Sequence, residues 1–219
     1  MKILALEFSS AQRSVAVLNS AAGTRSSFEV VETGQMGPFD MIEQALRETG
    51  LEREQIESVA VGLGPGSYTG IRAAIAIAQG WALASQARLL GIGSDQALAE
   101  QARAQGITGR VSVAIDAQRN EFYLETFELT AANCKTIDAL RLTGADEIHS
   151  RLQRGEIVVG PEMTKLSPSG RLLFPSAATI AALAQDRTDY VSGEELSPIY
   201  LRQTSFVKAP PPRIVPGTE

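Results

Sequence analysis

The sequence GLGPGSYTGIR, residues 62–72, separates a short apolar run from a long alanine-rich stretch, and it decides the fold prediction. Before it, ESVAV at 57–61 is short and β-branched, which is typical of a buried strand. After it, IRAAIAIAQGWALASQ at 71–86 is rich in alanine and predicts a helix. The stretch is therefore a strand-to-helix turn, where free amides and the positive end of a helix dipole can hold a phosphate.

The residues of this turn do not match the known phosphate-binding motifs. A Walker loop needs a lysine after its last glycine, but Gly66 is followed by Ser67. The dinucleotide fingerprint needs a third glycine, which is missing whether counting starts at Gly62 or at Gly64. We therefore interpret the turn as mainly structural, with Ser67 or Thr69 capping the first amides of the helix.

Composition limits the classes of function. The chain has 219 residues, 44% of them hydrophobic, and a formal net charge of −5, which argues against a surface that holds nucleic acid on its own. A single cysteine, Cys134, excludes an internal disulfide and a Cys-based zinc site. MKILALEF at the start lacks a signal-peptide core, and 71–84 is too short and too interrupted for a membrane span. We expect a cytoplasmic protein that contacts no membrane and contacts nucleic acid only indirectly.

The chain also contains an approximate internal repeat. The expected elements of the first half are three strands, a helix, a strand and a helix: 2–8, 13–19, 25–31, 38–50, 57–61 and 71–86. The second half repeats most of this order with three strands, a helix and a strand: 111–117, 120–129, 135–143, 145–153 and 156–162. This predicts a duplicated α/β domain: a first lobe at 1–105 that carries interface helices, a second lobe at 106–207, and a proline-rich extended tail at 208–219.

Two such lobes resemble the ribonuclease-H-like pair of the actin, Hsp70 and sugar-kinase (ASKHA) superfamily. Within it, the chain looks like the TsaB family, also called YeaZ. The motif G-x-GPGS-[FY]-TG-[IVL]-R followed by an apolar helix is the most specific match. The segments that carry the resemblance are ILALEFSSAQRSVAVL, GLGPGSYTGIRAAIAIAQGWALA, VAIDAQRNEFYLETF and SPIYLRQ.

This resemblance implies a function in tRNA modification. TsaB-type proteins are partners of TsaD, which transfers a threonylcarbamoyl group from its adenylate to the adenosine next to the anticodon of tRNAs reading ANN codons. TsaE, an ATPase, completes that assembly. The resemblance implies a non-catalytic scaffold that pairs with TsaD, or with itself in isolation, through helices of its first lobe. It implies no tightly bound cofactor but leaves room for a nucleotide at the partner interface, and the older peptidase label reflects kinship with TsaD.

The histidine content agrees with a non-catalytic role. TsaD-type enzymes hold a metal with paired histidines, whereas His149 is the only histidine of this chain. A Ser-His-Asp or Cys-His site would need the same side chain, and no G-x-S-x-G motif is present. We therefore expect neither catalytic residues nor a metal site.

A second interpretation stays open at the end of the first strand. Relatives in the superfamily place an Asp there to organise a metal-bound phosphate, and TsaB relatives usually carry Asp, but this chain has Glu7. The longer side chain suits strict octahedral magnesium geometry poorly, so Glu7 and its counterpart Asp116 are interpreted as turn residues. The alternative is a small-molecule kinase or ATPase that uses the 62–70 turn, with these nucleotide-binding candidates: Glu7, Ser9, Ser10, Gly64 and Gly66. A third alternative is a homodimeric interaction module with an unrelated partner.

The helix at 71–86 is expected to carry the interface. Its polar residues form one narrow stripe, spaced by seven: Arg72, Gln79 and Gln86. One face is formed by Ile71, Ile75, Ala78 and Ala82, and another, of small residues only, by Ala73, Ala76, Gly80 and Ala84. A helix that is apolar on both faces must be covered on both, either by a partner subunit or by the other lobe. The expected interface residues are Ile71, Arg72, Ala73, Ala76, Ile77, Gly80, Trp81 and Ala84.

Overall fold

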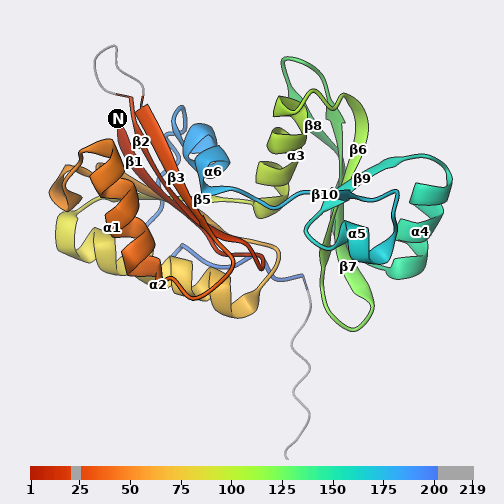
Figure 1. Ribbon diagram of the computed structural model, residues 1–219, viewed down its shortest axis with the longest axis horizontal. Helices are drawn as coiled ribbons and strands as arrows, with labels where there is room; N and C mark the ends of the chain where they lie inside the picture. The colour runs from red at the N-terminus through yellow and green to blue at the C-terminus, as the bar shows by residue number, and fades with distance from the viewer. Residues whose placement is uncertain (21–25, 202–219) are drawn as a thin grey trace, which may run out of the picture.

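The strands form two five-stranded sheets of the same topology, in a computed structural model that describes residues 1–20 and 26–201 (Figure 1). The first sheet has the order β3-β2-β1-β4-β5 and the second the order β8-β7-β6-β9-β10. Strands of the first sheet are β1 (Lys2–Glu7), β2 (Arg13–Asn19), β3 (Ser26–Glu32), β4 (Ser58–Gly62) and β5 (Arg88–Ile92). Strands of the second are β6 (Gly109–Asp116), β7 (Glu121–Leu129), β8 (Cys134–Gly144), β9 (Ile157–Gly160) and β10 (Arg171–Leu172).

In each sheet the first three strands are antiparallel, and the first strand then pairs in parallel with the fourth. This confirms the predicted duplication and the fold class, two ribonuclease-H-like lobes of the ASKHA superfamily. The helices are α1 (Pro38–Thr49), the 3-10 turn η1 (Arg53–Gln55), α2 (Tyr68–Ser85), α3 (Ser94–Ala104), α4 (Ala145–Gln153), α5 (Met163–Leu166) and α6 (Ala177–Ala184).

Alternation along β1 explains why it lies at the centre of the first sheet. Leu4 and Leu6 pack on the side of α1 and α2, while Ile3 and Ala5 pack on the side of α6. All four are fully buried. A strand that is apolar on both faces needs helices on both, and the first sheet has them.

Two helices are exchanged between the lobes. α3, from the first half of the chain, packs its Leu98 and Ala102 on the second sheet. α6, from the second half, packs its Ile180 on the first sheet, and the two helices contact each other (Figure 1). The sequence prediction placed 94–104 in the first lobe and 177–184 in the second. The structure corrects this, because each of these two helices packs on the sheet of the other lobe. The predicted tail at 208–219 lies outside the described residues.

A buried pair of carboxyl groups lies where α3 packs against β7 of the second sheet. Asp95 is 3% exposed and Glu125 is 7% exposed. The Thr136 hydroxyl donates a hydrogen bond to Glu125 Oε1 at 3.0 Å. Burial, together with a hydrogen bond that protonated Asp95 donates to Glu125 and the charge of Glu125, raises the pKa of Asp95 to about 8. Asp95 is therefore protonated in the folded protein at neutral pH and shares its proton with Glu125.

This pair predicts that the folded protein loses stability as the pH rises. Asp95 has an ordinary pKa of 3.8, so between that value and 8 the folded chain holds a proton that the unfolded chain has released. Unfolding then releases close to one proton, and the free energy of unfolding should fall by about 1.3 kcal/mol per pH unit between pH 5 and 7. Urea denaturation over this range should show a clearly shallower slope for Asp95→Asn than for the wild type, with the remaining slope coming from other carboxyl groups of raised pKa, such as Glu7 and Glu162. An equal slope in both proteins would contradict the assignment.

Candidate functional site

The glycine turn between β4 and α2 is held by hydrogen bonds within the protein. The Ser67 amide donates to the Ser9 carbonyl oxygen at 2.6 Å, and the Gly64 amide donates to Ser94 Oγ at 3.2 Å. Ser67 Oγ caps α2 by accepting from the Gly70 amide at 3.3 Å, as the sequence predicted for this residue. Several amides that a phosphate cradle would use therefore already have acceptors.

Two glycines of the turn are needed because the β1–β2 turn lies against them. A Cβ on Gly66 would come 2.1 Å from the Ser9 carbonyl oxygen, and one on Gly70 would come 1.9 Å from the Phe8 carbonyl oxygen. Gly66 also has φ of +147°, which other residues rarely adopt. The glycines allow close packing of two turns, which explains them without a ligand.

Glu7 lies beneath this turn and is fully buried. Its Oε1 accepts a hydrogen bond from the Ser9 amide at 2.7 Å, and its Oε2 accepts one from the Ser94 hydroxyl at 2.8 Å. Burial raises the pKa of Glu7, against the lowering effect of the hydrogen bonds from Ser9 and Ser94. The carboxyl group thus ties β1 to the start of α3, in agreement with a turn residue.

Glu7→Ala should therefore destabilise the fold. The substitution empties a buried site and leaves the Ser9 amide and Ser94 hydroxyl without their acceptor, which should cost about 2–4 kcal/mol of unfolding free energy. Glu7→Gln keeps the volume and one acceptor and should cost clearly less. Chemical denaturation of both variants measures this. Wild-type stability of Glu7→Ala combined with loss of tRNA modification would instead place Glu7 in a functional site.

The structure places only some of the nucleotide-binding candidates at a common cavity. Ser9, Ser10 and Gly66 line a cavity of about 590 Å³ between the lobes, whereas Glu7 and Gly64 are buried and do not line it. Asp116 lines the same cavity from the second lobe. The only histidine, His149, does not line this cavity, and its Nε2 lies 3.4 Å from the Leu166 carbonyl oxygen in the second lobe.

α2 presents its predicted small-residue face to solvent. The residues exposed there are Arg72, Ala73, Ala76, Gly80 and Ala84. A Cβ built on Gly80 meets no atom within 4 Å, so this face is not covered by the second lobe. The opposite face, with Ala74 and Ala78, packs into the core of the first lobe.

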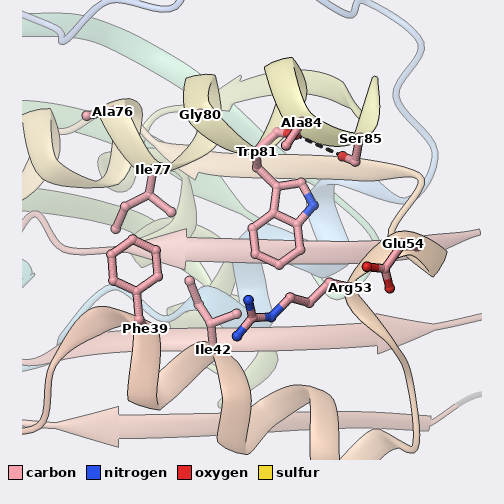
Figure 2. Close-up of a pocket in the computed structure, with 10 residues that line it drawn as sticks. All are labelled: Phe39, Ile42, Arg53, Glu54, Ala76, Ile77, Gly80, Trp81, Ala84 and Ser85. Carbon is pink, nitrogen blue, oxygen red and sulfur yellow. Dashed lines mark hydrogen bonds between the residues drawn. The ribbon is translucent and has the colours of Figure 1, made fainter.

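One predicted interface residue is wrong. Ile71 is 1% exposed and belongs to the core of the first lobe, where its Cδ1 lies beside Gly64. It follows the glycine turn directly, so it faces the sheet rather than the open side of α2. Ile77 and Trp81 are half-buried and point from α2 toward α1 (Figure 2).

The open face of α2 forms one wall of a groove with a volume of about 610 Å³ (Figure 2). We call it the α1–α2 groove. α2 contributes Ala76, Ile77, Gly80, Trp81 and Ala84. The facing wall comes from Phe39 and Ile42 of α1, and η1 contributes Arg53 and Glu54.

Sequence reasoning missed some residues of this surface. Phe39 is 64% exposed, although the apolar stripe of its helix continues into the buried Ile42 and Leu46. Leu83 is 88% exposed on α2 beside the small residues. Arg53 reaches into the groove below Trp81 from η1, a three-residue 3-10 turn that is too short for hydrophobic periodicity to predict (Figure 2). Leu83 could have been predicted from the sequence, because it is a large apolar residue next to the small-residue face.

The fold and the groove define the class: a two-lobed protein of the ASKHA superfamily with an open apolar surface on its first lobe. The family described as TsaD, tRNA N6-adenosine threonylcarbamoyltransferase, matches residues 39–202. Within that class, the chain belongs to the TsaB/YeaZ family.

Named relatives cover almost the whole chain. The tRNA threonylcarbamoyladenosine biosynthesis protein TsaB of Escherichia coli (strain K12) is 30% identical, with 92% of this chain and 95% of that protein covered. Its counterpart in Haemophilus influenzae is 28% identical over 96% and 98% of the two chains. Among solved structures, YeaZ from Pseudomonas aeruginosa has a TM-score of 0.74 and 26% identity, with 91% and 99% covered.

Within residues 1–20 and 26–201, no group of three or more His, Cys, Asp or Glu side chains is arranged to hold a metal ion. In the same part of the chain, none of the helices combines the length and hydropathy that a membrane crossing requires.

Proposed function

We propose that this chain is the non-catalytic partner subunit of a TsaD-type transferase, which it holds and activates through the α1–α2 groove. The transferase would add the threonylcarbamoyl group to the adenosine next to the anticodon of tRNAs reading ANN codons. The observation that carries the proposal is the open small-residue face of α2, around Gly80. The relatives' names as tRNA threonylcarbamoyladenosine biosynthesis proteins supply the pathway.

The groove has the properties of a subunit interface. Phe39 and Leu83 expose most of their side chains, and burying them is the kind of gain that drives association. Gly80 and its small neighbours let a second helix approach the α2 backbone closely. Trp81 offers an aromatic anchor, and Arg53 and Glu54 add charged groups beside this apolar surface.

The same groove would serve two partners in turn. In isolation it would pair two copies of this chain, and in the complex it would hold the transferase. A TsaE-type ATPase would join the assembled complex, in the cytoplasm, and no cofactor would bind this chain tightly, although a nucleotide could lie at the partner interface. With a formal net charge of −5, the chain would contact tRNA only indirectly.

The alternative function, a small-molecule kinase or ATPase, has weaker support. Glu7 is enclosed and hydrogen-bonded to Ser9 and Ser94, so it is not placed to organise a metal-bound phosphate. The amides of Gly64, Ser67 and Gly70 already donate within the protein. This arrangement favours a structural role for the glycine turn.

A reconstituted modification assay tests the proposal. With threonylcarbamoyl-adenylate as the donor and MgATP for the ATPase, the cognate TsaD-type transferase and TsaE-type ATPase should convert tRNA to the threonylcarbamoyladenosine form at least about tenfold faster when this chain is added. The chain alone should neither hydrolyse MgATP nor modify tRNA. MgATP turnover by the chain alone, with no stimulation of the transferase, would favour the kinase or ATPase instead.

A further inference from the structure

The two lobes contribute different kinds of side chain to the cavity between them. The first lobe contributes the hydroxyl groups of Ser9 and Ser10 and the start of α2. The second contributes the carboxylates Asp116 and Glu162, and tyrosines line the cavity beside them. Of the described residues that line it, none is Lys, Arg or His. The described residues that line the cavity therefore offer negative charge and aromatic surface.

The two carboxylates are held next to each other by the backbone. Glu162 Oε2 accepts a hydrogen bond from the Asp116 amide at 3.3 Å. Asp116 Oδ1 accepts one from the Gln118 amide at 2.7 Å, which fixes the side chain at the end of β6. Burial and the nearby charge of Asp116 raise the pKa of Glu162, against the Asp116 amide and the charge of Lys165. A cation in the cavity would relieve this like-charge contact.

Aromatic rings complete the site. Tyr68 of α2 and Tyr200 stack with their ring centroids 5.5 Å apart, and Tyr123 of β7 also lines the cavity. The Arg72 guanidinium carbon lies 5.2 Å from the centroid of the Tyr68 ring. The protein's own guanidinium is therefore already placed in cation–π geometry at the edge of the site.

The same features disfavour the other ligands of this size. Phosphate groups would meet two carboxylates, and the amides of Ser67 and Gly70 are already engaged. A metal ion would find no third His, Cys, Asp or Glu side chain near these two in the described part of the chain. Arg119 and Lys165 line a separate cavity that shares Asp116 and Glu162, and the charge of Lys165 acts to lower the pKa of Glu162.

We propose that the inter-lobe cavity binds an organic cation, a guanidinium or primary ammonium group, between the Asp116–Glu162 carboxylates and the tyrosines. The cation could be a free polyamine or a basic side chain, since both present the same chemistry. The inference is independent of the proposed function, because it concerns the cavity between the lobes rather than the α1–α2 groove.

Calorimetric titration of the full chain at low salt tests this, with spermidine and Nα-acetyl-arginine amide as probes and MgATP as the comparison ligand. We expect at least one cation to bind and MgATP not to bind. Asp116→Asn/Glu162→Gln should weaken cation binding at least tenfold. The amide side chains keep the acceptors for the Gln118 and Asp116 amides, so folding should be preserved.

A matched control removes two charges elsewhere. Glu128→Gln/Asp186→Asn changes two exposed carboxylates outside the cavity and should leave the affinity within about twofold of the wild type. Preference for spermidine would indicate a free polyamine, and preference for the arginine derivative a basic side chain. Absence of cation binding, equal loss in both double variants, or tight MgATP binding that Asp116→Asn/Glu162→Gln leaves intact would overturn the proposal.

Discussion

Gly80→Leu should abolish most of the pairing with a TsaD-type transferase while leaving the fold intact. The added side chain would enter space that a closely approaching helix needs, and overpacking of this kind costs about 1–3 kcal/mol, so affinity should fall about 30-fold. Gly80 has open space around it, and leucine favours a helix more than glycine by roughly 1 kcal/mol. The variant's melting temperature should therefore equal or exceed that of the wild type.

Ala104→Leu provides the control, because it adds the same kind of side chain at an exposed position of α3 in the second lobe. It should bind the transferase and self-associate like the wild type, whereas Gly80→Leu should sediment as a monomer. Calorimetry and analytical ultracentrifugation measure both properties. A lowered melting temperature of Gly80→Leu with unchanged pairing would show that this face of α2 is not an interface.

Arg151→Ala should cause the largest loss of stability of any change considered. Arg151 is 7% exposed on α4, and its Nη1 donates to Ser112 Oγ at 3.0 Å and to Thr126 Oγ1 at 3.4 Å. It also forms ion pairs with Glu147 and Glu156. Removing the guanidinium empties a buried site and leaves the Ser112 and Thr126 hydroxyls without this donor. Glu147 and Glu156 keep Arg141 and Arg154 as partners but lose one ion pair each, and the total cost should be about 3–5 kcal/mol.

Urea denaturation measures this loss, and Arg151→Lys gives the matched comparison. Lysine keeps the charge but cannot donate to Ser112 and both carboxylates from one planar group, so it should recover only part of the stability. The Arg151→Ala protein that remains folded should stimulate tRNA modification by the transferase as well as the wild type does. A cost below about 1 kcal/mol for Arg151→Ala would contradict this account of the second lobe.

The repeat was predictable from the sequence because many of its strands and helices have a local pattern of apolar and polar residues. Strand alternation places β1, β2 and β7 within two residues of their observed bounds, and Ser67 marks the start of α2. β5 and α3 were not predicted, because RLLGI follows a helix without a strong break and can be taken as its continuation. The exchange of α3 and α6 depends on which sheet each helix reaches, and no local pattern encodes that.

The candidate site, too, was predictable from the sequence only in part. Helical periodicity was enough to predict the small-residue face of α2, since Ala76, Gly80 and Ala84 lie on one element. Phe39 and Arg53 come from α1 and η1, so their approach to α2 is a tertiary contact. The inter-lobe cavity combines Tyr68 with Glu162 and Tyr200, which are far apart in the sequence and meet only in the folded chain.

Hydrogen–deuterium exchange of the chain with and without its TsaD-type transferase tests the central claim most directly. Pairing through the α1–α2 groove predicts slower exchange in α1, η1 and α2 when the transferase is added, with little change in β8 and α4 of the second lobe. Protection of the second lobe, with α1 and α2 exchanging as in the free protein, would contradict the account.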